Sequence, residues 1–214
     1  MKTLVFNGWA AGPDIWALCD FERDYLFSYL ESLEGLPRRV LAESEAALLV
    51  GFSMGGTFAL KMLLEFPEKI RGLVLISSTP RMMEEPSAGW LGMSPRRRRA
   101  LKLGTQLVYR NDPSPIYRED NLERGLKFLD ETDLRAELLA RKDEFDFPVY
   151  VFQSERDGIV RPTNAVFFKE LFPSAEVTMI PGGEHVLPIT AYSAISAAVK
   201  AAASRTSSAQ GRLR

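Results

Sequence analysis

The residues around Ser53 constrain the fold more than any other stretch of the sequence. An apolar run over residues 46–50 leads into Gly51-Phe52-Ser53-Met54-Gly55, and residues 57–66 follow with helical spacing until Pro67. Glycines on both sides of a serine permit a sharp strand-to-helix turn that larger side chains would obstruct. The pattern therefore predicts a buried strand, a tight turn that exposes the Ser53 hydroxyl, and a helix that stops at the proline.

Other apolar runs extend this unit into a sheet. The candidate elements are strands over residues 3–6, 25–30, 70–76, 148–152 and 176–180 and helices over 163–171 and 189–203. Residues 20–33 could instead be scored as one helix. Strands that alternate with helices are typical of a mostly parallel sheet covered on both faces, so we predict an α/β fold.

One long insertion interrupts the alternation. Residues 81–147 are polar and charged, and apolar residues recur at three-to-four spacing over 122–139, which is typical of amphipathic helices. We therefore expect a core formed by residues 1–80 and 148–203, a helical cap over 81–147, and a disordered tail over 204–214.

Composition excludes several classes of protein. The 214 residues suit one domain, and the net charge of −1 gives no global field that would attract nucleic acid or a membrane. Cys19 is the only cysteine and His185 the only histidine, which excludes a disulfide framework and a metal site of clustered Cys and His ligands. The apolar run 3–6 is too short for a signal peptide or a membrane span. We expect a cytoplasmic protein without metal or cofactor.

His185 is the candidate general base. A serine hydroxyl is a weak nucleophile that needs an adjacent base, and this chain has one imidazole to supply it. His185 lies in the glycine-containing segment 181–188 after the last predicted strand, from which it could reach the Ser53 turn. The alternative is a histidine that only packs or lies on the surface.

Asp157 is the candidate acid of a Ser-His-Asp triad. It follows the predicted strand 148–152, between Ser53 and His185 in chain order. Glu155 on the same loop is the rival, whereas Asp143 and Asp146 precede the strand and would emerge at the opposite end of the sheet.

An acyl-transfer site also needs two hydrogen-bond donors for the oxyanion. The amide of Met54, directly after the serine, is the first candidate. The amide of Trp9, at the end of the first predicted strand, is the second, and its indole could form a wall of the substrate pocket. Alternatively, Trp9 only packs.

A basic cluster marks the predicted cap. It comprises Arg96, Arg97, Arg98, Arg99 and Lys102. The cluster could be a solvated helix face, or it could dock an acidic carrier protein that presents a tethered acyl chain. Nucleic acid is disfavoured because no interleaved aromatic residues accompany the run.

Several segments resemble the α/β-hydrolases, and among them the biotin-synthesis carboxylesterases that demethylate pimeloyl-[acyl-carrier protein] methyl ester. The similar segments are Asn7-Gly8-Trp9-Ala10 with Trp16, Ser77-Ser78-Thr79-Pro80, residues 125–129 and 132–135, and the acid loop 157–162. The resemblance spans about residues 3–200. Asn7 stands where that family usually has histidine, and the short segment 20–46 resembles a second, compact family of biotin-synthesis esterases.

The resemblance implies a triad of Ser53, Asp157 and His185, oxyanion donors at Trp9 and Met54, and a basic cap that meets acyl carrier protein. We therefore expect a serine carboxylesterase that hydrolyses an acyl methyl ester. The alternatives are a general esterase for small esters, a non-catalytic binding protein on the same fold, and a haloperoxidase or C–C hydrolase that uses the same triad.

Overall fold

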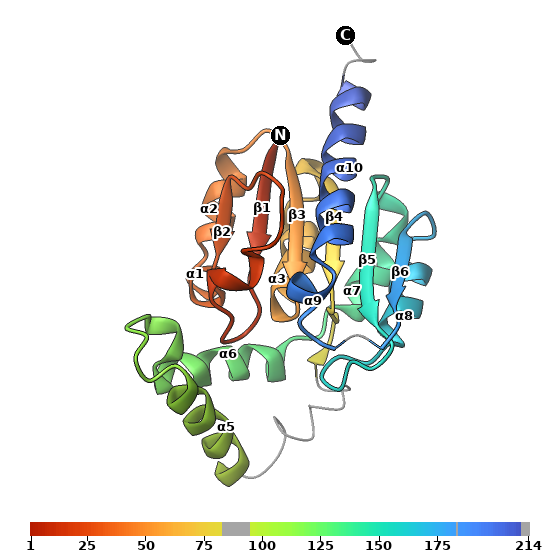
Figure 1. Cartoon of the computed structure of the whole chain (residues 1–214). Helices are drawn as coiled ribbons and strands as arrows, with labels where there is room; N and C mark the ends of the chain where they lie inside the picture. The colour runs from red at the N-terminus through yellow and green to blue at the C-terminus, as the bar shows by residue number, and fades with distance from the viewer. Residues whose placement is uncertain (83–94, 183, 211–214) are drawn as a thin grey trace.

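The computed structural model describes residues 1–82, 95–182 and 184–210, and its centre is one parallel sheet (Figure 1). Six strands lie in the order β2-β1-β3-β4-β5-β6, and every neighbouring pair is parallel. The strands are β1 Lys2–Phe6, β2 Tyr25–Phe27, β3 Ala47–Phe52, β4 Ile70–Ile76, β5 Val149–Ser154 and β6 Glu176–Ile180. This sheet confirms the predicted α/β class.

The central strands are buried because both faces of the sheet are covered. Side chains alternate between the faces, so that Leu49 of β3 joins one core cluster while Leu48 and Val50 join the other. The helices α3 Met54–Glu65 and α8 Asn164–Leu171 pack on the first face, and α10 Tyr192–Gln210 covers β4 on the second (Figure 1). A strand buried on both sides has no polar alternation, which is why its sequence is a continuous apolar run.

Parallel strands bring their carboxyl ends to one edge of the sheet. Phe52 of β3 pairs with Ile76 of β4, which pairs with Phe152 of β5. The loops that follow these strands therefore start side by side, at the edge where open α/β sheets hold their ligands. The candidate site residues of the core lie in loops at this edge, except for Met54, which is the first residue of α3.

Helices of the predicted cap lie across the same edge. They are α5 Pro95–Val108 and α6 Glu119–Glu131, with the short η4 Pro115–Tyr117 between them (Figure 1). Tyr29 of the core donates a hydrogen bond from its hydroxyl to Ile116 O at 2.5 Å, which ties η4 to the sheet. The chain then returns to β5 through α7 Arg135–Ala140 and η5 Lys142–Glu144.

Two expectations near the amino terminus need correction. The strand predicted over residues 25–30 ends at Phe27, and α1 Tyr29–Leu33 begins directly after it. Ser28 and Glu31 form a capping box that starts this helix, because each side chain accepts a backbone N–H of the other residue.

The helix α2 Leu36–Glu43 was not predicted at all. Two further short helices are η1 Pro13–Trp16 and η2 Pro67–Lys69.

The carboxyl-terminal region also differs from the prediction. Instead of one helix over 189–203 and a disordered tail from Ser204, the chain forms α9 Leu187–Thr190 and then α10, which continues to Gln210. Arg205 on α10 pairs with Glu176 of β6 at 2.8 Å, and this ion pair extends the contact of the helix with the sheet. The last four residues of the predicted tail lie outside the described residues. No helix in the described ranges is long and apolar enough to span a membrane.

The turn after β3 depends on the absence of a side chain at Gly55. A Cβ atom added there would lie 2.1 Å from Phe6 O, a backbone atom at the end of β1 that cannot easily move. We predict that Gly55→Ala lowers the free energy of unfolding by about 3 kcal/mol, the upper range for overpacking. Urea denaturation followed by circular dichroism measures this loss.

Gly104→Ala is the matched control. Gly104 lies in α5 with nothing within 4 Å of an added Cβ atom, so this variant should gain up to about 1 kcal/mol of stability from helix propensity. Equal effects of the two substitutions would contradict the packing argument.

Candidate active site

Ser53 occupies a strained turn between β3 and α3. Its backbone angles are φ 54° and ψ −124°, a conformation that residues other than glycine rarely adopt. The Ser53 amide donates to Ile76 O at 2.9 Å, and the Gly56 amide donates to Ser53 O at 2.9 Å, so both sides of the turn are fixed by the backbone. The turn therefore holds the hydroxyl above the carboxyl edge of the sheet, as the glycine pattern predicts.

His185 reaches this hydroxyl from the loop between β6 and α9. Its Nε2 atom lies 2.9 Å from Ser53 Oγ, and its Nδ1 atom lies 2.9 Å from Asp157 Oδ2. A carboxylate only accepts hydrogen bonds, so the Nδ1–H group donates to Asp157, and Nε2 can accept from the serine hydroxyl. Phe52 packs beside the imidazole with ring centroids 5.2 Å apart. The side chain of His185 is 12% exposed, so it is not completely closed off from solvent.

Asp157 is the carboxylate that the structure brings to His185. Its side chain is fully buried, and Oδ1 accepts the amides of Ile159 and Val160, each at 2.8 Å. The rival Glu155 is exposed, although its backbone amide donates to Ile180 O. Geometry therefore favours Asp157 over Glu155.

The environment of Asp157 stabilises its charged form. Burial alone would raise the pKa of this carboxyl group, but the hydrogen bond and charge of His185, with the Val160 and Ile159 amides, lower the pKa below its ordinary value. Gln153 adds a hydrogen bond from Nε2 to Oδ2 at 3.2 Å. Sequence reasoning missed Gln153, although a glutamine inside the apolar run of β5 and four residues before the acid was a usable signal.

The segment after β1 lies against the Ser53 turn. A Cβ atom added at Gly8 would be 3.1 Å from Ser53 Cβ, so the backbone next to Trp9 runs beside the serine. Met54 follows the serine as the first residue of α3 and is buried. These positions agree with the expectation that the Trp9 and Met54 amides point toward the reacting oxygen, and the donor role itself stays a prediction.

The Trp9 indole connects the core to α6. Its Nε1–H donates to Leu122 O at 3.0 Å, and a Cβ atom added at Gly125 would lie 2.5 Å from Trp9 Cδ1. The indole therefore packs closely against α6, and Trp9 holds the segment after β1 against the predicted cap.

Asn7 has a structural role at the position where the resembling family usually has histidine. It is 2% exposed, and its Oδ1 atom accepts a hydrogen bond from the indole Nε1–H of the buried Trp16. The Asn7 amide also donates to Phe27 O at 2.9 Å, which joins the ends of β1 and β2.

The basic cluster divides into two parts. Arg96 and Arg99 are exposed on α5, whereas the side chains of Arg97 and Arg98 lie outside the described residues. Lys102 does not belong to the exposed part: its side chain is 12% exposed, and its ammonium lies 2.9 Å from Glu123 and 3.3 Å from Glu119. Because these two carboxylates belong to α6, Lys102 joins the two cap helices.

Over the described ranges, no group of three His, Cys, Asp or Glu side chains could hold a metal ion.

Comparisons of the sequence point to one kind of protein. Residues 25–113 match the alpha/beta hydrolase fold family. A pimeloyl-[acyl-carrier protein] methyl ester esterase of Shewanella woodyi is 29% identical over 64% of this chain and 70% of its own length. The proteins of the same name from Nitrosospira multiformis and Cronobacter sakazakii are 26% and 25% identical, and the chain covers 63% and 85% of their lengths.

Comparisons of the structure agree. A thermophilic esterase superposes with a TM-score of 0.65 at 20% identity, over 96% of this chain and 90% of that one. A bromoperoxidase from Bacillus anthracis superposes with the same TM-score at 18% identity, over 92% and 90%. The chain therefore has the α/β-hydrolase fold, and in sequence it is similar to the pimeloyl-[acyl-carrier protein] methyl ester esterases.

Proposed function

We propose that this protein is a serine carboxylesterase with Ser53 as nucleophile, His185 as general base and Asp157 as the orienting acid. The observation that carries the proposal is the continuous hydrogen-bonded path from Asp157 through His185 to Ser53, with 2.9 Å at each step. A nucleophile, a base and a third group that orients the base form the arrangement that activates serine for acyl transfer.

The reaction proceeds through an acyl-enzyme. Ser53 Oγ forms a bond to the ester carbonyl carbon while its proton passes to His185 Nε2, and the Trp9 and Met54 amides stabilise the resulting oxyanion. The tetrahedral intermediate then collapses, the alcohol leaves, and the alkoxy oxygen takes the proton from His185. A water molecule then attacks the acyl carbon while its proton passes to His185 Nε2. The bond between the acyl carbon and Ser53 Oγ breaks, Oγ takes the proton from His185, and the acid leaves.

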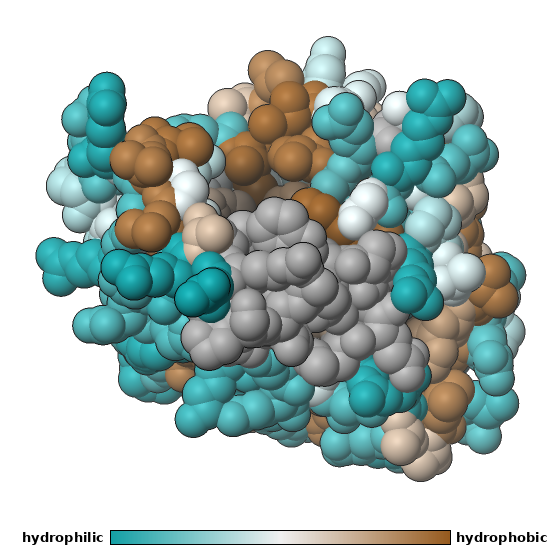
Figure 2. Space-filling model, turned by 90° about the horizontal axis from the view of Figure 1, so that it is seen from below, coloured by the Kyte–Doolittle hydropathy of each residue, from teal (hydrophilic) through white to brown (hydrophobic). Residues whose placement is uncertain are grey.

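For the substrate we propose the methyl ester of an acyl chain carried on acyl carrier protein. The names of the curated relatives support this assignment. The exposed face of α5 supports it chemically, because Arg96, Arg99 and Leu103 follow one another at helical spacing and are all exposed. Figure 2 views the molecule from the carboxyl edge of the sheet and shows hydrophobic patches beside hydrophilic residues on this side of the protein. A mixed basic and apolar surface suits an acidic carrier that presents an apolar chain.

The first test is hydrolysis of p-nitrophenyl acetate and of a free acyl methyl ester. We predict that Ser53→Ala lowers kcat by roughly 10⁴- to 10⁶-fold, because the nucleophile is lost. Ser193→Ala, at an exposed serine of α10, is the control and should retain full activity. Wild-type protein that hydrolyses neither ester, nor a carrier-bound methyl ester, would contradict the esterase proposal.

Asp157→Asn tests the acid. It should lower kcat by about 10⁴-fold, because the amide no longer holds the imidazole in the reactive tautomer, whereas Glu155→Gln at the exposed rival should change little. Similar losses in both variants, or a greater loss in Glu155→Gln, would overturn the assignment.

The lowered pKa of the Asp157 carboxyl group predicts that the free energy of unfolding depends on pH. Because its pKa is lower in the folded protein than in the unfolded chain, its stabilisation is complete above the ordinary value near 3.8 and is lost as the pH falls below it. Denaturant titrations from pH 6 down to pH 2 should show a smaller loss of unfolding free energy on acidification in Asp157→Asn than in wild type. An unchanged acid slope would contradict this reading of the carboxylate.

The carrier-protein substrate is tested by charge reversal on α5. We predict that the double variant Arg96→Glu/Arg99→Glu has a kcat/KM for a carrier-bound methyl ester that is roughly tenfold or more below that of wild type, because electrostatic attraction speeds association. Raised salt should reduce this difference between variant and wild type, because it screens the charges. The free methyl ester should be hydrolysed as in wild type, and Arg39→Glu on α2 serves as the control. Equal use of the carrier-bound ester by all three proteins would contradict carrier docking at α5.

A further inference from the structure

A glutamine interrupts the apolar run of β5 next to the proposed triad. Gln153 is the last residue but one of this strand, and it is 1% exposed. On the same face of the strand, Val149 and Val151 belong to the apolar core. A buried amide costs free energy unless its hydrogen bonds are made. Gln153 therefore needs polar partners at the carboxyl edge of the sheet.

The side-chain amide of Gln153 has two acceptors within reach. Its Nε2 atom lies 3.2 Å from Asp157 Oδ2 and 3.2 Å from Val160 O. A carboxylate and a backbone carbonyl oxygen only accept hydrogen bonds, so the nitrogen end of the amide must face them. This nitrogen carries two N–H donors, one for each acceptor. Gln153 therefore ties the carboxylate of Asp157 to the backbone of the loop that follows it.

The bond from Gln153 completes the hold on the Asp157 carboxylate. Oδ1 accepts the amides of Ile159 and Val160 at 2.8 Å each. Held at Oδ1 alone, the carboxylate could tilt about this oxygen. Nδ1 of His185 lies 2.9 Å from Oδ2 and 3.1 Å from Oδ1, so a tilt would move Oδ2 away from the imidazole. The hydrogen bond from Gln153 to Oδ2 opposes that tilt.

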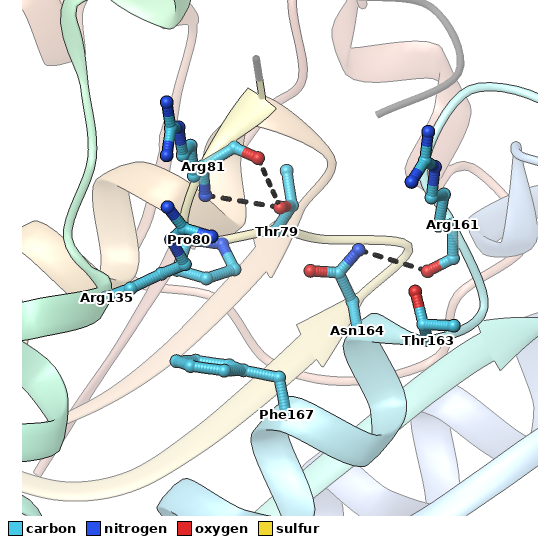
Figure 3. A pocket seen from close by; sticks show the side chains of 8 residues that line it. All are labelled: Thr79, Pro80, Arg81, Arg135, Arg161, Thr163, Asn164 and Phe167. Carbon is cyan, nitrogen blue, oxygen red and sulfur yellow. Dashed lines mark hydrogen bonds between the residues drawn. The ribbon is translucent and has the colours of Figure 1, made fainter. Parts of the chain in front are cut away.

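Both ends of this connection are themselves fixed. Gln153 lies opposite Met179 of β6, and β5 also pairs with β4 on its other side. On the loop, the carbonyl of Arg161, next to Val160, accepts the side-chain and backbone amides of Asn164 at 3.0 Å each; Figure 3 shows the side-chain bond. A group on a paired strand holds its partner more precisely than a group on a loop.

We propose that Gln153 is a positioning residue of the triad, which holds Asp157 Oδ2 against His185 Nδ1 by tying the carboxylate to the Val160 carbonyl. The inference deepens the proposed function and rests on it for the kinetic consequence alone. Gln153 acts through Asp157 and not on the substrate. The alternative is a purely structural role, in which Gln153 only satisfies the Val160 carbonyl.

The first experiment observes the imidazole without turnover. His185 is the only histidine of the chain, so protein with isotope-labelled histidine nitrogens gives the NMR signals of one ring. At a pH at which the ring is neutral, these signals give the ratio of the Nδ1–H and Nε2–H tautomers. Wild type should be mostly the Nδ1–H tautomer, because Nδ1 donates to Asp157. In Gln153→Met, which keeps a side chain of similar length but has no N–H donor, the Nε2–H share should rise several-fold.

Val151→Ala is the matched control. It removes buried apolar atoms from the same face of β5, so it should lower Tm without touching Asp157. Gln153→Met should also lower Tm, because it removes buried hydrogen bonds. The two variants therefore compare destabilisation with and without loss of the donor, and the tautomer ratio of Val151→Ala should equal that of wild type.

The second experiment measures kcat and KM for a free methyl ester. Gln153→Met should lower kcat roughly tenfold, the effect of one hydrogen bond to a charged group, and leave KM as in wild type. Val151→Ala should keep both values. In Asp157→Asn, the further change Gln153→Met should cause no additional loss, because a residue that acts through the carboxylate has nothing left to position.

The proposal is overturned if Gln153→Met keeps the tautomer ratio or the kcat of wild type, or if wild type itself does not favour the Nδ1–H tautomer. It is also overturned if Val151→Ala lowers kcat as much as Gln153→Met does, or if the losses in the double variant multiply. If wild type hydrolyses no ester, the esterase proposal fails, and the tautomer measurement still decides whether Gln153 positions Asp157.

Discussion

The two hydrogen bonds of the His185 ring are the interaction on which the rest of the site depends. They join three loops that are far apart in sequence, with Ser53 on one side of the imidazole and Asp157 on the other. The parallel sheet makes this possible, because β3, β5 and β6 all end at one edge and direct their following loops to the same place. Strain at Ser53 and burial at Asp157 are costs that the packed core offsets. The ordering of His185 between these fixed groups is therefore a consequence of the fold.

Much of this arrangement could be predicted from the sequence. The Ser53 turn, the apolar strands and the chain order of serine, acid and histidine predict both the fold and the residues that the structure brings together. The sequence already favours Asp157 over Glu155, and the structure adds the physical difference between them, because Asp157 is buried against His185 whereas Glu155 is exposed. The start of α1 was missed because the apolar residues after Phe27 look like a continuation of the strand. The Ser28–Glu31 capping box is the signal that a helix begins there. Gln153 was missed although a buried glutamine in an apolar strand is a local signal, whereas the extension of α10 to Gln210 depends on tertiary contacts that no local pattern specifies.

Positively charged side chains have different surroundings at the carboxyl edge. Lys102 pairs with two carboxylates of α6 and joins α5 to α6. Arg96 and Arg99 are exposed to solvent on α5. Trp9 connects these regions to the chemistry, because its indole binds α6 while its backbone lies next to the Ser53 turn. The segment after β1 therefore contacts both α6 and the Ser53 turn.

The central claim is that His185 activates Ser53 as a nucleophile, and covalent trapping tests it most directly. Wild type and His185→Gln would be treated with a fluorophosphonate, which forms a stable adduct with activated serines, and the labelled peptide would be identified by mass spectrometry. We predict that wild type is labelled stoichiometrically on Ser53. Labelling of His185→Gln should be slower by several orders of magnitude, because the base that activates the serine is lost. Labelling of another residue, no labelling, or equal rates in the two proteins would contradict it.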